Sequence, residues 1–406
     1  MPGRARGRAV VIGGSLSGLF AALLLRRSGW DVDVYERVGA ELAGRGAGIV
    51  THRLVWDVLD ALAIDWRADL GVTVSMRRMF DLSGRLILEH PCEQTFTSWD
   101  RLYAMLRGVF PSERYHRGKE LVRVTDSDDG VTAHFADGTA AMADLLVGAD
   151  GLRSSVRAQF LPDIVPLYAG YAAWRGLVPE AAFSPALHAD LFDYLAFCLP
   201  PGEQMLAYPV AGPDNDLRVG HRRYNFVWYR PADDRALQHL LTDDAGHTHA
   251  VSIPPPLISR TVLAEMRAAA ERVLAPQFRE MMRLADQPFL QPIYDIEAPR
   301  MVFGRAVLIG DAAFVARPHV GAGVAKAAQD ALALCEALAA GCDIPAALAR
   351  FETERLEMGR RIIAHARHLG AYMQAQQKTA HERRMAEQHR SPERVLTETA
   401  VLDFLD

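Results

Sequence analysis

Three short stretches of the sequence place an acidic residue beside glycines, directly after an apolar run. The stretches are Gly13-Gly14-Ser15 with Gly18 and Glu36, then Asp150-Gly151, then Gly310-Asp311. Glycine has no Cβ, so a glycine turn lets backbone N–H groups approach a phosphate. A carboxylate at the end of a strand can accept hydrogen bonds from sugar hydroxyls. This combination predicts that the ligand is a nucleotide cofactor.

The first stretch lies between an expected buried strand at residues 8–12 and an amphipathic helix that Gly29 ends. Ser15 replaces the second glycine of the GxGxxG fingerprint, so the turn alone is a weak signal. Glu36 strengthens it, because it ends the next expected strand, where it can bind both ribose hydroxyls of an adenosine. The alternative is a structural glycine turn followed by a surface acid.

The second and third stretches bear on which dinucleotide is bound. One fingerprint fits NAD as well as FAD. Both later stretches again put an acid at the end of an apolar run, and the last one continues through Pro318, Gly321 and Gly323 into a long expected helix. A simple NAD dehydrogenase has no reason to repeat the arrangement twice, so the pattern favours FAD.

Composition limits the class of protein. The chain has 406 residues, of which 50% are hydrophobic, so it can bury a large core in two or three units. Its 45 basic and 50 acidic residues give a net charge of −5, which offers no attraction for nucleic acid or an anionic membrane. No apolar run is long enough for a membrane span or a signal peptide. Four scattered cysteines without CxxC spacing argue against zinc and disulfides and favour a reducing cytoplasm.

The predicted fold class is mixed α/β. A Rossmann-like FAD-binding domain with a parallel sheet is joined by a second domain with a mostly antiparallel sheet and by C-terminal helices at 324–340 and 345–377. Short alternating strands with SG, DDG and DG turns are expected over 70–140, and 166–298 is expected to form the second sheet with a long loop over it. The predicted FAD-binding domain covers 1–70, 100–165 and 290–375, the substrate-binding domain covers 71–99 and 166–289, and 376–406 is a charged tail. For the tail, a solvated helix or frayed terminus is favoured over a partner-binding segment.

The three stretches resemble a known family, the single-component FAD-dependent aromatic hydroxylases, also called group A flavoprotein monooxygenases. The matching pieces are GGSLSG with Glu36, DGLRSSVR at 150–157, and GDAAFVARPHVGAG at 310–323 followed by a helix containing Asp330. They occur in the family's order and spacing, and the resemblance extends over residues 1–375. The expected partners are a small aromatic substrate and O2, with a homodimer as the expected assembly.

The resemblance implies a two-step reaction. NADH or NADPH reduces FAD, and the reduced flavin takes up O2 to form a C4a-hydroperoxide that hydroxylates an electron-rich aromatic or N-heteroaromatic ring. The phrases YAGYAAWRG, RYH and RPH are similar to those of members that act on hydroxypyridines, so 2,6-dihydroxypyridine is an expected substrate. The family has no separate nicotinamide-binding domain, so the choice between NADH and NADPH stays open.

The resemblance also assigns residues. Asp311 would bind a ribityl hydroxyl, Pro318 would lie beside the isoalloxazine, and Gly321 to Val324 would offer N–H groups to its pyrimidine edge. The full set of expected cofactor residues is Gly13, Ser15, Leu16, Ser17, Gly18, Glu36, Arg37, Arg45, Gly48, Ile49, Arg101, Val122, Asp150, Gly310, Asp311, Pro318, Gly321, Ala322, Gly323 and Val324. The cofactor does the hard step, so the protein is expected to position the substrate. His319 is the first candidate near the ring, followed by Tyr208, Tyr224 and His52, although a tyrosine on a strand is more often a core residue.

Three positions depart from the family pattern. Phe314 stands where many members have histidine after Gly-Asp-Ala-Ala, and Ala325 stands where many have asparagine. Trp99 occupies the place of an arginine that reaches the FAD in many members, and Arg101 is the expected substitute. These changes put individual flavin contacts in doubt.

Other functions remain open from the sequence. A flavin-dependent reductase or halogenase could use the same scaffold, but the WxWxIP signature of halogenases is missing. A flavin-binding redox sensor or sequestering protein would bind flavin without turnover. A dehydrogenase without flavin would be colourless. Substrate-dependent NAD(P)H consumption with a hydroxylated product distinguishes a hydroxylase from all three.

Overall fold

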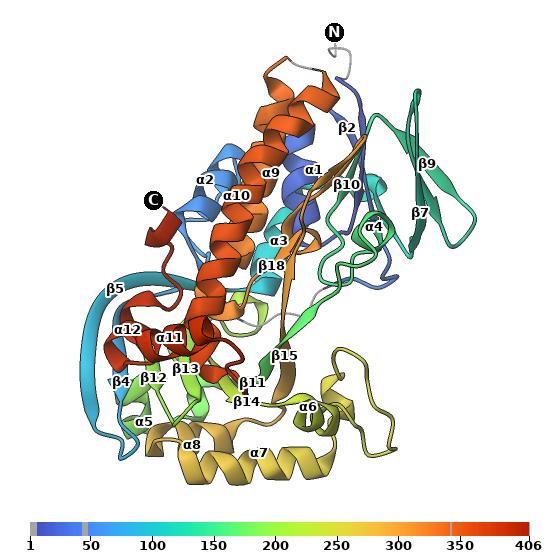
Figure 1. Cartoon of the computed structure of the whole chain (residues 1–406). Coiled ribbons are helices and arrows are strands. Elements are labelled where there is room, and N and C mark those ends of the chain that lie inside the picture. The colour runs from blue at the N-terminus through green and yellow to red at the C-terminus, as the bar shows by residue number, and fades with distance from the viewer. Residues whose placement is uncertain (1–5, 43–47, 342, 406) are drawn as a thin grey trace.

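The computed structural model describes residues 6–42, 48–341 and 343–405. Two sheets lie one above the other, with long helices beside the upper sheet and shorter helices below the lower one (Figure 1). The mixed α/β class and the Rossmann-like unit predicted from the sequence are confirmed. Arg45, one of the predicted cofactor residues, lies outside the described residues.

The upper sheet is mainly parallel and has six strands in the described part of the chain. In spatial order they are β16 (Val302–Phe303), β17 (Ala306–Leu308), β10 (Leu145–Gly148), β1 (Arg8–Ile12), β2 (Asp31–Glu36) and β6 (Tyr115–Arg117). Only the edge pair β16 and β17 is antiparallel. The carboxyl ends of β1, β2, β10 and β17 therefore meet at one edge, where a doubly wound sheet binds ligands.

Layers cover both faces of this sheet. One side carries α1 (Leu16–Arg27), α2 (Arg53–Ala61), α3 (Trp99–Val109), α9 (Gly323–Ala339) and α10 (Ile344–Gly370). The other carries a small sheet of β7 (Leu121–Ser127), β8 (Gly130–Phe135) and β9 (Ala140–Ala143), which packs on β1 and β10. Helix α1 is apolar on nearly all sides because it lies between the sheet and α9.

The lower sheet has nine strands within the described residues and is mostly antiparallel. Its order is β18 (Phe314–Val315), β15 (Phe289–Glu297), β11 (Leu167–Pro179), β14 (Arg223–Pro231), β13 (Gln204–Val210), β12 (Leu195–Cys198), β4 (Val72–Phe80), β5 (Leu86–Ser98) and β3 (Gly48–Thr51). The pair β4 and β12 is parallel. The strands of the lower sheet thus come from several segments of the chain that are separated in sequence by strands of the upper sheet.

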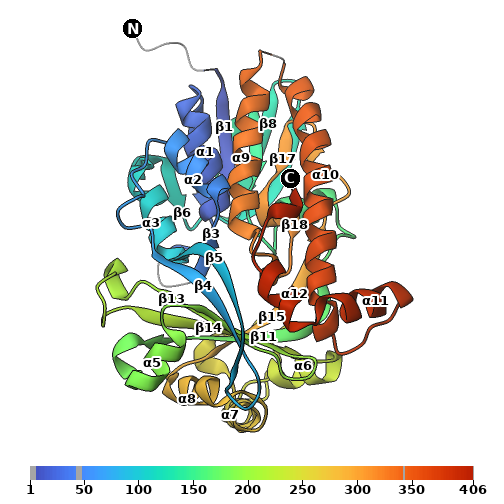
Figure 2. The same cartoon turned by 90° about the vertical axis from the view of Figure 1, so that its left-hand side faces the viewer.

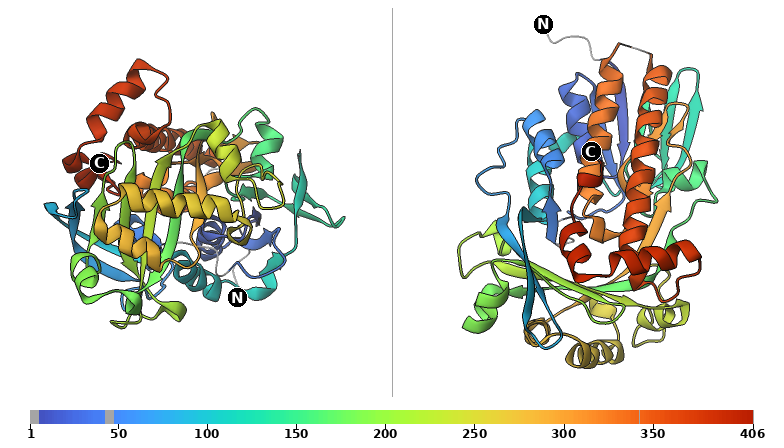
Figure 3. Two further views of the ribbon diagram at one scale, coloured as in Figure 1. Left: turned by 90° about the horizontal axis from the view of Figure 1, so that it is seen from below. Right: turned by 60° about the vertical axis from the view of Figure 1, so that its left-hand side comes forward.

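Alternation along the strands divides the lower sheet into two faces. On β14, Tyr224, Phe226 and Trp228 pack into one core cluster, whereas Val227 and Tyr229 belong to another. The first cluster is covered by helices α5 (Pro185–Leu191), α6 (Asp234–Leu240), α7 (Arg260–Val273) and α8 (Pro276–Leu284). Figure 3 shows α7 and α8 lying across the underside of the sheet. The other face looks toward the upper sheet.

Three regions differ from the expected elements. Residues 70–140 contain the helix α3 between the strands, and the second domain contains α5 to α8 in addition to its sheet and loop. The tail folds into α11 (Ala380–His389) and α12 (Pro392–Glu398), and Val395 and Leu396 are buried. The dense charges of this segment suggested a solvated tail, but burial of the apolar Val395 and Leu396 attaches it to the rest of the protein. Across the described ranges, no helix has the length and hydropathy needed to cross a membrane.

Candidate active site

The glycine turn between β1 and α1 is shaped by contacts that leave no room for side chains. Gly13 has a φ of 106°, in the left-handed region that favours glycine. A Cβ at Gly18 would overlap the Gly13 carbonyl oxygen, and a Cβ at Gly14 would overlap the Tyr115 ring. The Tyr115 hydroxyl donates to the Gly14 carbonyl oxygen at 2.9 Å. The turn therefore brings the start of α1 to the strand ends, where Gly13 and Ser15 line a cavity.

Glu36 lies in the same cavity at the end of β2. Its carboxylate accepts hydrogen bonds from the Gly14 N–H at 2.8 Å and the Val38 N–H at 2.9 Å. An ionised carboxylate has about four lone-pair positions. Two positions stay available for ligand hydroxyls, as the predicted ribose contact requires.

The second acid, Asp150, follows β10 and holds the start of α4 (Ser155–Phe160). Its carboxylate accepts from the Ser154 hydroxyl at 2.5 Å and from the Ser155 N–H at 2.7 Å. Burial raises the pKa of Asp150 above its ordinary value despite these donors. Arg157, which is buried, donates to the Ala312 carbonyl oxygen at 2.9 Å. The second and third predicted stretches are therefore in direct contact.

The third acid, Asp311, lies in a turn held by buried charges. Asp330 on α9 accepts from the Gly310 N–H at 2.9 Å, and Lys326 donates to the Gly310 carbonyl oxygen at 2.8 Å. Arg355 on α10 donates to Asp330 at 2.8 Å, and Lys326 pairs with it at 3.0 Å. Burial opposes ionisation of Asp330, but these two cations keep its pKa below the ordinary value. The cluster fixes the backbone on which Asp311 sits.

The Asp311 side chain makes no hydrogen bond to the described residues. Its surface is open to a cavity, although protein atoms surround it closely enough to raise its pKa. An acceptor that is crowded, unpartnered and open to a cavity is suited to a ligand hydroxyl.

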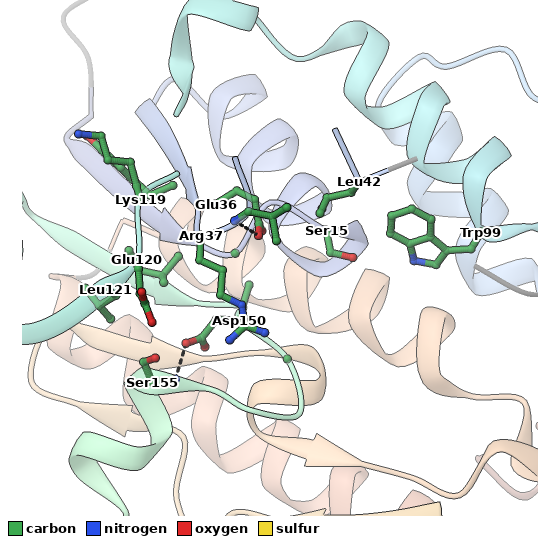
Figure 4. A pocket seen from close by; sticks show the side chains of 16 residues that line it. Ser15, Glu36, Arg37, Leu42, Trp99, Lys119, Glu120, Leu121, Asp150 and Ser155 are labelled. Carbon is green, nitrogen blue, oxygen red and sulfur yellow. Dashed lines mark hydrogen bonds between the residues drawn. The ribbon is translucent and has the colours of Figure 1, made fainter. Parts of the chain in front are cut away.

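The first cavity has a volume of about 230 Å³ and lies at the carboxyl ends of β1, β2 and β10 (Figure 4). Ser15, Glu36 and Asp150 line it together with the cations Arg37 and Lys119. Figure 4 shows Arg37 extending toward Asp150. Cations suit phosphate oxygens and the carboxylates suit sugar hydroxyls, so the lining matches a nucleotide.

The second cavity, about 260 Å³, lies between the two sheets. Its walls include the side chains of Phe96, Leu206, Tyr208, Val227 and Tyr229 from the lower sheet. The lining also includes predicted cofactor residues: Gly48 and Ile49 on β3 of the same sheet, and Asp311, Pro318, Gly321, Gly323 and Val324 from the segment between β17 and α9 and from the start of α9. Aromatic and aliphatic side chains beside a set of polar groups are typical of a site for an aromatic ring with polar substituents.

Two helix N-termini are left free at these cavities. Within the described chain, most helices start at a side-chain cap, as Ser98 caps α3. Helices α1, α2, α8 and α9 have neither a side-chain cap nor an acid in the first turn, and of these α1 and α9 start at the cavities. Next to the α1 terminus, the Ser17 hydroxyl is buried without a hydrogen-bond partner in the described residues. A Cβ at Gly323 would meet open space. These donors fit a dinucleotide with a phosphate at α1 and an electronegative ring edge at α9, which is the shape of FAD.

Two candidate substrate residues line the second cavity. The Tyr208 hydroxyl donates to the Gly48 carbonyl oxygen at 2.9 Å, and its ring stacks on Phe96 with centroids 4.2 Å apart. His319 is 2% exposed, and its Nε2 lies 3.1 Å from the Tyr171 hydroxyl. Burial lowers the pKa of His319 to about 3, so this imidazole is neutral at pH 7.

The other two candidates do not line the cavity. His52 Nε2 lies 3.1 Å from the Gly321 carbonyl oxygen, so the neutral ring supports the loop as a donor. Tyr224 is fully buried on the opposite face of β14, and its hydroxyl donates to the Leu191 carbonyl oxygen at 2.7 Å. Successive side chains on a strand point to opposite faces, so Tyr224 points into the core beneath the sheet, whereas Tyr229 points into the cavity.

The remaining predicted cofactor residues fall into two groups. Leu16 and Ala322 are buried at the starts of α1 and α9. Arg101, by contrast, pairs with Asp69 at 2.5 Å and does not line either cavity, and Val122 is 61% exposed on β7. The neighbouring Leu121 lines the first cavity, because alternation along β7 turns it inward.

The structure adds residues that the sequence reasoning did not select. Trp99 and Lys119 line the first cavity. Arg175 on β11, and Thr399 and Ala400 after α12, line the second. Arg175 could have been found from the sequence, because it is the single charged residue of the apolar strand YAAWRGLV and a charge in such a strand suggests a role in a site. No sequence pattern connects the tail with the cavity.

Acidification from pH 7 to pH 5 is expected to destabilise the protein through His52 and His319. Burial lowers the pKa of His52 to about 4 and that of His319 to about 3, from an ordinary value of 6.5. Below pH 6.5 the unfolded chain therefore binds protons that the folded chain excludes, and stability falls by up to about 1.4 kcal/mol per pH unit for each histidine. Urea denaturation at both pH values measures the loss. His52→Gln should flatten the dependence, and an unchanged dependence would contradict this assignment.

A parallel sheet with three glycine-and-acid turns at its carboxyl edge, Glu36 in the cavity at that edge and a second cavity beside a separate sheet together fit a flavoprotein of the dinucleotide-binding class. Comparison with known proteins narrows this class. Residues 290–366 match the family model described as FAD binding domain, and residues 168–295 match FAD binding domain-like.

The chain belongs to the family of FAD-dependent aromatic monooxygenases. It is 35% identical to 2,6-dihydroxypyridine 3-monooxygenase of Paenarthrobacter nicotinovorans, over 90% of this chain and 91% of that protein. The structure of 2,6-dihydroxypyridine-3-hydroxylase from Arthrobacter nicotinovorans superposes with a TM-score of 0.85, covering 91% of this chain and 93% of that one. Klebsiella pneumoniae HpxO, complexed with FAD and uric acid, is 25% identical and superposes with a TM-score of 0.76 over 98% of this chain and 96% of that one. The resemblance seen in the three stretches is confirmed.

Proposed function

We propose that the protein hydroxylates a hydroxypyridine, such as 2,6-dihydroxypyridine, with NADH or NADPH as reductant and O2 as oxidant, in the cytoplasm. Similarity to 2,6-dihydroxypyridine 3-monooxygenase, at 35% identity, supports this ring. The observation that carries the proposal is the second cavity, where aromatic walls surround Arg175, a cation that has no carboxylate partner among the described residues.

The residues of the chain would divide the work between binding and positioning. Glu36 and the start of α1 would hold the adenosine and pyrophosphate, while Asp311 and the start of α9 would hold the ribityl chain and the ring. Bound FAD supplies hydride acceptance and oxygen activation. The aromatic and aliphatic side chains of the lower sheet would limit water in the space beside Pro318 and Val324, which favours oxygen transfer over release of H2O2.

Arg175 is suited to hold the substrate as an electron-rich anion. Its guanidinium donates to the Gln291 side-chain oxygen at 2.8 Å and reaches the Gly48 carbonyl oxygen at 3.5 Å, and its Nε has no partner in the described chain. All of these acceptors are neutral, so the positive charge stays available. A ring oxygen that loses its proton beside this cation makes the ring more reactive toward an electrophilic oxygen.

His319 is proposed as a second polar group near the ring. Its imidazole is neutral at pH 7, and a hydrogen bond between its Nε2 and the Tyr171 hydroxyl fixes the orientation of the ring. Tyr208 would then act as a wall residue, since its hydroxyl already donates to Gly48.

A panel of hydroxylated pyridines and phenols tests the proposed function. Each compound is scored for stimulated NADH and NADPH oxidation, and products are identified by mass. We expect a hydroxypyridine to give the strongest stimulation with a product heavier by one oxygen atom. Bound flavin without stimulated turnover by any ring would reject the proposal in favour of a flavin-binding sensor or sequestering protein.

Arg175→Met is expected to weaken binding of 2,6-dihydroxypyridine by roughly 30- to 150-fold, because a buried hydrogen bond to a charged group contributes about 2–3 kcal/mol. FAD content should not change. Titration calorimetry of the oxidised enzyme measures the affinity directly. Arg223→Met is the matched control, since Arg223 lies on the adjacent strand β14, donates to the Ala211 carbonyl oxygen and does not line the cavity. Equal affinities for both variants would remove Arg175 from the substrate site.

A further inference from the structure

The segment of residues 391–405, named here the C-terminal wall, returns from the helices to the second cavity. It consists of α12, the residues after it and a short 3-10 helix at Asp403–Leu405. Figure 2 shows α12 between α10 and the long strands β4 and β5. Thr399 and Ala400, which follow α12, line the cavity, and Ala400 packs against the core cluster that contains Phe96 and Tyr208. A segment that sequence analysis assigned to a solvated tail is therefore part of the site.

Ala400 joins the two sides of the cavity through its backbone. Its N–H donates to the His319 carbonyl oxygen at 2.8 Å, and its carbonyl oxygen accepts from the Gln94 side chain at 2.8 Å. Its φ is 55°, a left-handed conformation that a non-glycine residue adopts only when surrounding contacts enforce it. A Cβ added at Gly321 would lie only 2.9 Å from Ala400. The C-terminal wall thus fits tightly against the loop proposed to carry the flavin ring.

Two buried side chains of the lower sheet anchor the C-terminal wall. Arg77 on β4 is fully buried and donates to the Leu396 carbonyl oxygen at 2.6 Å and to the Gln94 side-chain oxygen at 2.7 Å. Carbonyl groups at the end of a helix such as α12 carry partial negative charge, which favours a cation there. Without the wall, Arg77 would lose the Leu396 carbonyl oxygen and keep the Gln94 side-chain oxygen as an acceptor inside the protein. The buried Arg77 of the lower sheet therefore anchors the C-terminal wall through the Leu396 carbonyl oxygen.

Apolar contacts continue the same attachment. Val395 and Leu396 are 3% and 2% exposed and belong to the core cluster that contains the cavity residues Phe96 and Tyr208. Further along, Phe404 stacks on His365 of α10 with ring centroids 4.0 Å apart. The C-terminal wall is consequently packed on both the lower sheet and α10.

We infer that the C-terminal wall closes the substrate cavity and that Thr399 is a specificity-determining residue, which limits the size of the ring and presents a hydroxyl to its polar substituents. This inference rests on the proposed function for the identity of the ring. Thr399 is 5% exposed and lines the cavity, and its hydroxyl makes no hydrogen bond to the described part of the chain. It is the polar side chain that the wall contributes to the cavity lining.

Substitution of Thr399 tests the specificity role. Thr399→Leu fills space and removes the hydroxyl, so we expect at least a tenfold weaker affinity for 2,6-dihydroxypyridine by calorimetry and a lower ratio of product to NAD(P)H consumed. Thr397→Leu is the matched control, because Thr397 lies on the same segment with an exposed side chain that donates to the Glu393 carbonyl oxygen. Affinity within twofold of the control would overturn the role of Thr399.

A measurement without substrate tests closure of the cavity. Iodide quenching of the bound flavin's fluorescence reports access of solvent ions to the ring. We expect the quenching constant to rise at least threefold when residues 391–406 are deleted, and also in Arg77→Met, which keeps the chain length and frees the wall. Unchanged quenching in Arg77→Met, with FAD bound and the fold intact by circular dichroism, would overturn closure. If the wild-type protein hydroxylates no pyridine, the proposed function fails, while the quenching result still decides closure.

Discussion

Replacing Asp330 with alanine is expected to lower the free energy of unfolding by about 3–5 kcal/mol, the range found when one partner of a buried ion pair is removed. Asp330 is 2% exposed and is the shared partner of Lys326 and Arg355, both of which are buried. Its removal leaves two cations without the carboxylate and also frees the Gly310 N–H. Urea denaturation of the purified variant measures the loss.

Glu354→Ala is the matched control for Asp330→Ala. Glu354 also pairs with Arg355, at 3.7 Å, but its side chain is 64% exposed. Exposed ion pairs contribute little because water screens them. We therefore expect Glu354→Ala to unfold at nearly the wild-type urea concentration. Similar losses in both variants would show that Asp330 has no special place in the charge cluster.

Asp311→Ala is expected to yield largely apo protein. The Asp311 carboxylate opens to the second cavity with no partner in the described residues, so its proposed role is to accept a hydrogen bond from the ribityl chain. Loss of a charge-assisted hydrogen bond of about 1.5–3 kcal/mol weakens affinity by roughly 10- to 150-fold. The ratio of flavin to protein after purification, and a titration of the apo protein with FAD, measure the effect.

Asp311→Asn separates loss of charge from loss of the acceptor. The amide oxygen of asparagine can still accept a hydrogen bond, so this variant should bind FAD with an affinity between those of the wild type and Asp311→Ala. Full FAD occupancy in Asp311→Ala would remove Asp311 from the set of cofactor residues.

The nucleotide half of the fold could be predicted because its signals are local. A buried strand, a glycine turn, an apolar helix and a strand ending in Glu36 occur within one continuous stretch, and each element has its own period. The acids Asp150 and Asp311 follow apolar runs in the same way. Parallel strands then bring such turns to one edge, so adjacency of distant residues follows from topology.

The differences between the expected and the observed cavity linings share one physical cause, which is that a local sequence pattern does not say against which face or segment a residue packs. Tyr224 and Tyr229 are both tyrosines on β14, yet opposite parity places only Tyr229 in the cavity. Val122 was one residue away from Leu121, which does line the first cavity. Thr399 reaches the second cavity through Arg77 and Gln94, which are more than 300 residues earlier in the chain. Contacts between residues so far apart in the chain produce no periodic pattern in the sequence, so they could not be predicted from it.

The strand order of the upper sheet has a consequence for biosynthesis. The central strand β1 is made first, but its neighbour β10 begins only at Leu145, and β17 beyond it ends at Leu308. During translation the edge of β1 that pairs with β10 therefore stays unpaired until Gly148 has been made, and β10 in turn lacks its neighbour β17 until Leu308 has been made. Nonlocal parallel pairing is slow and exposes strand edges. The nascent chain should accordingly depend on chaperones until just over three quarters of it has been made, a fraction set by Leu308 within 406 residues.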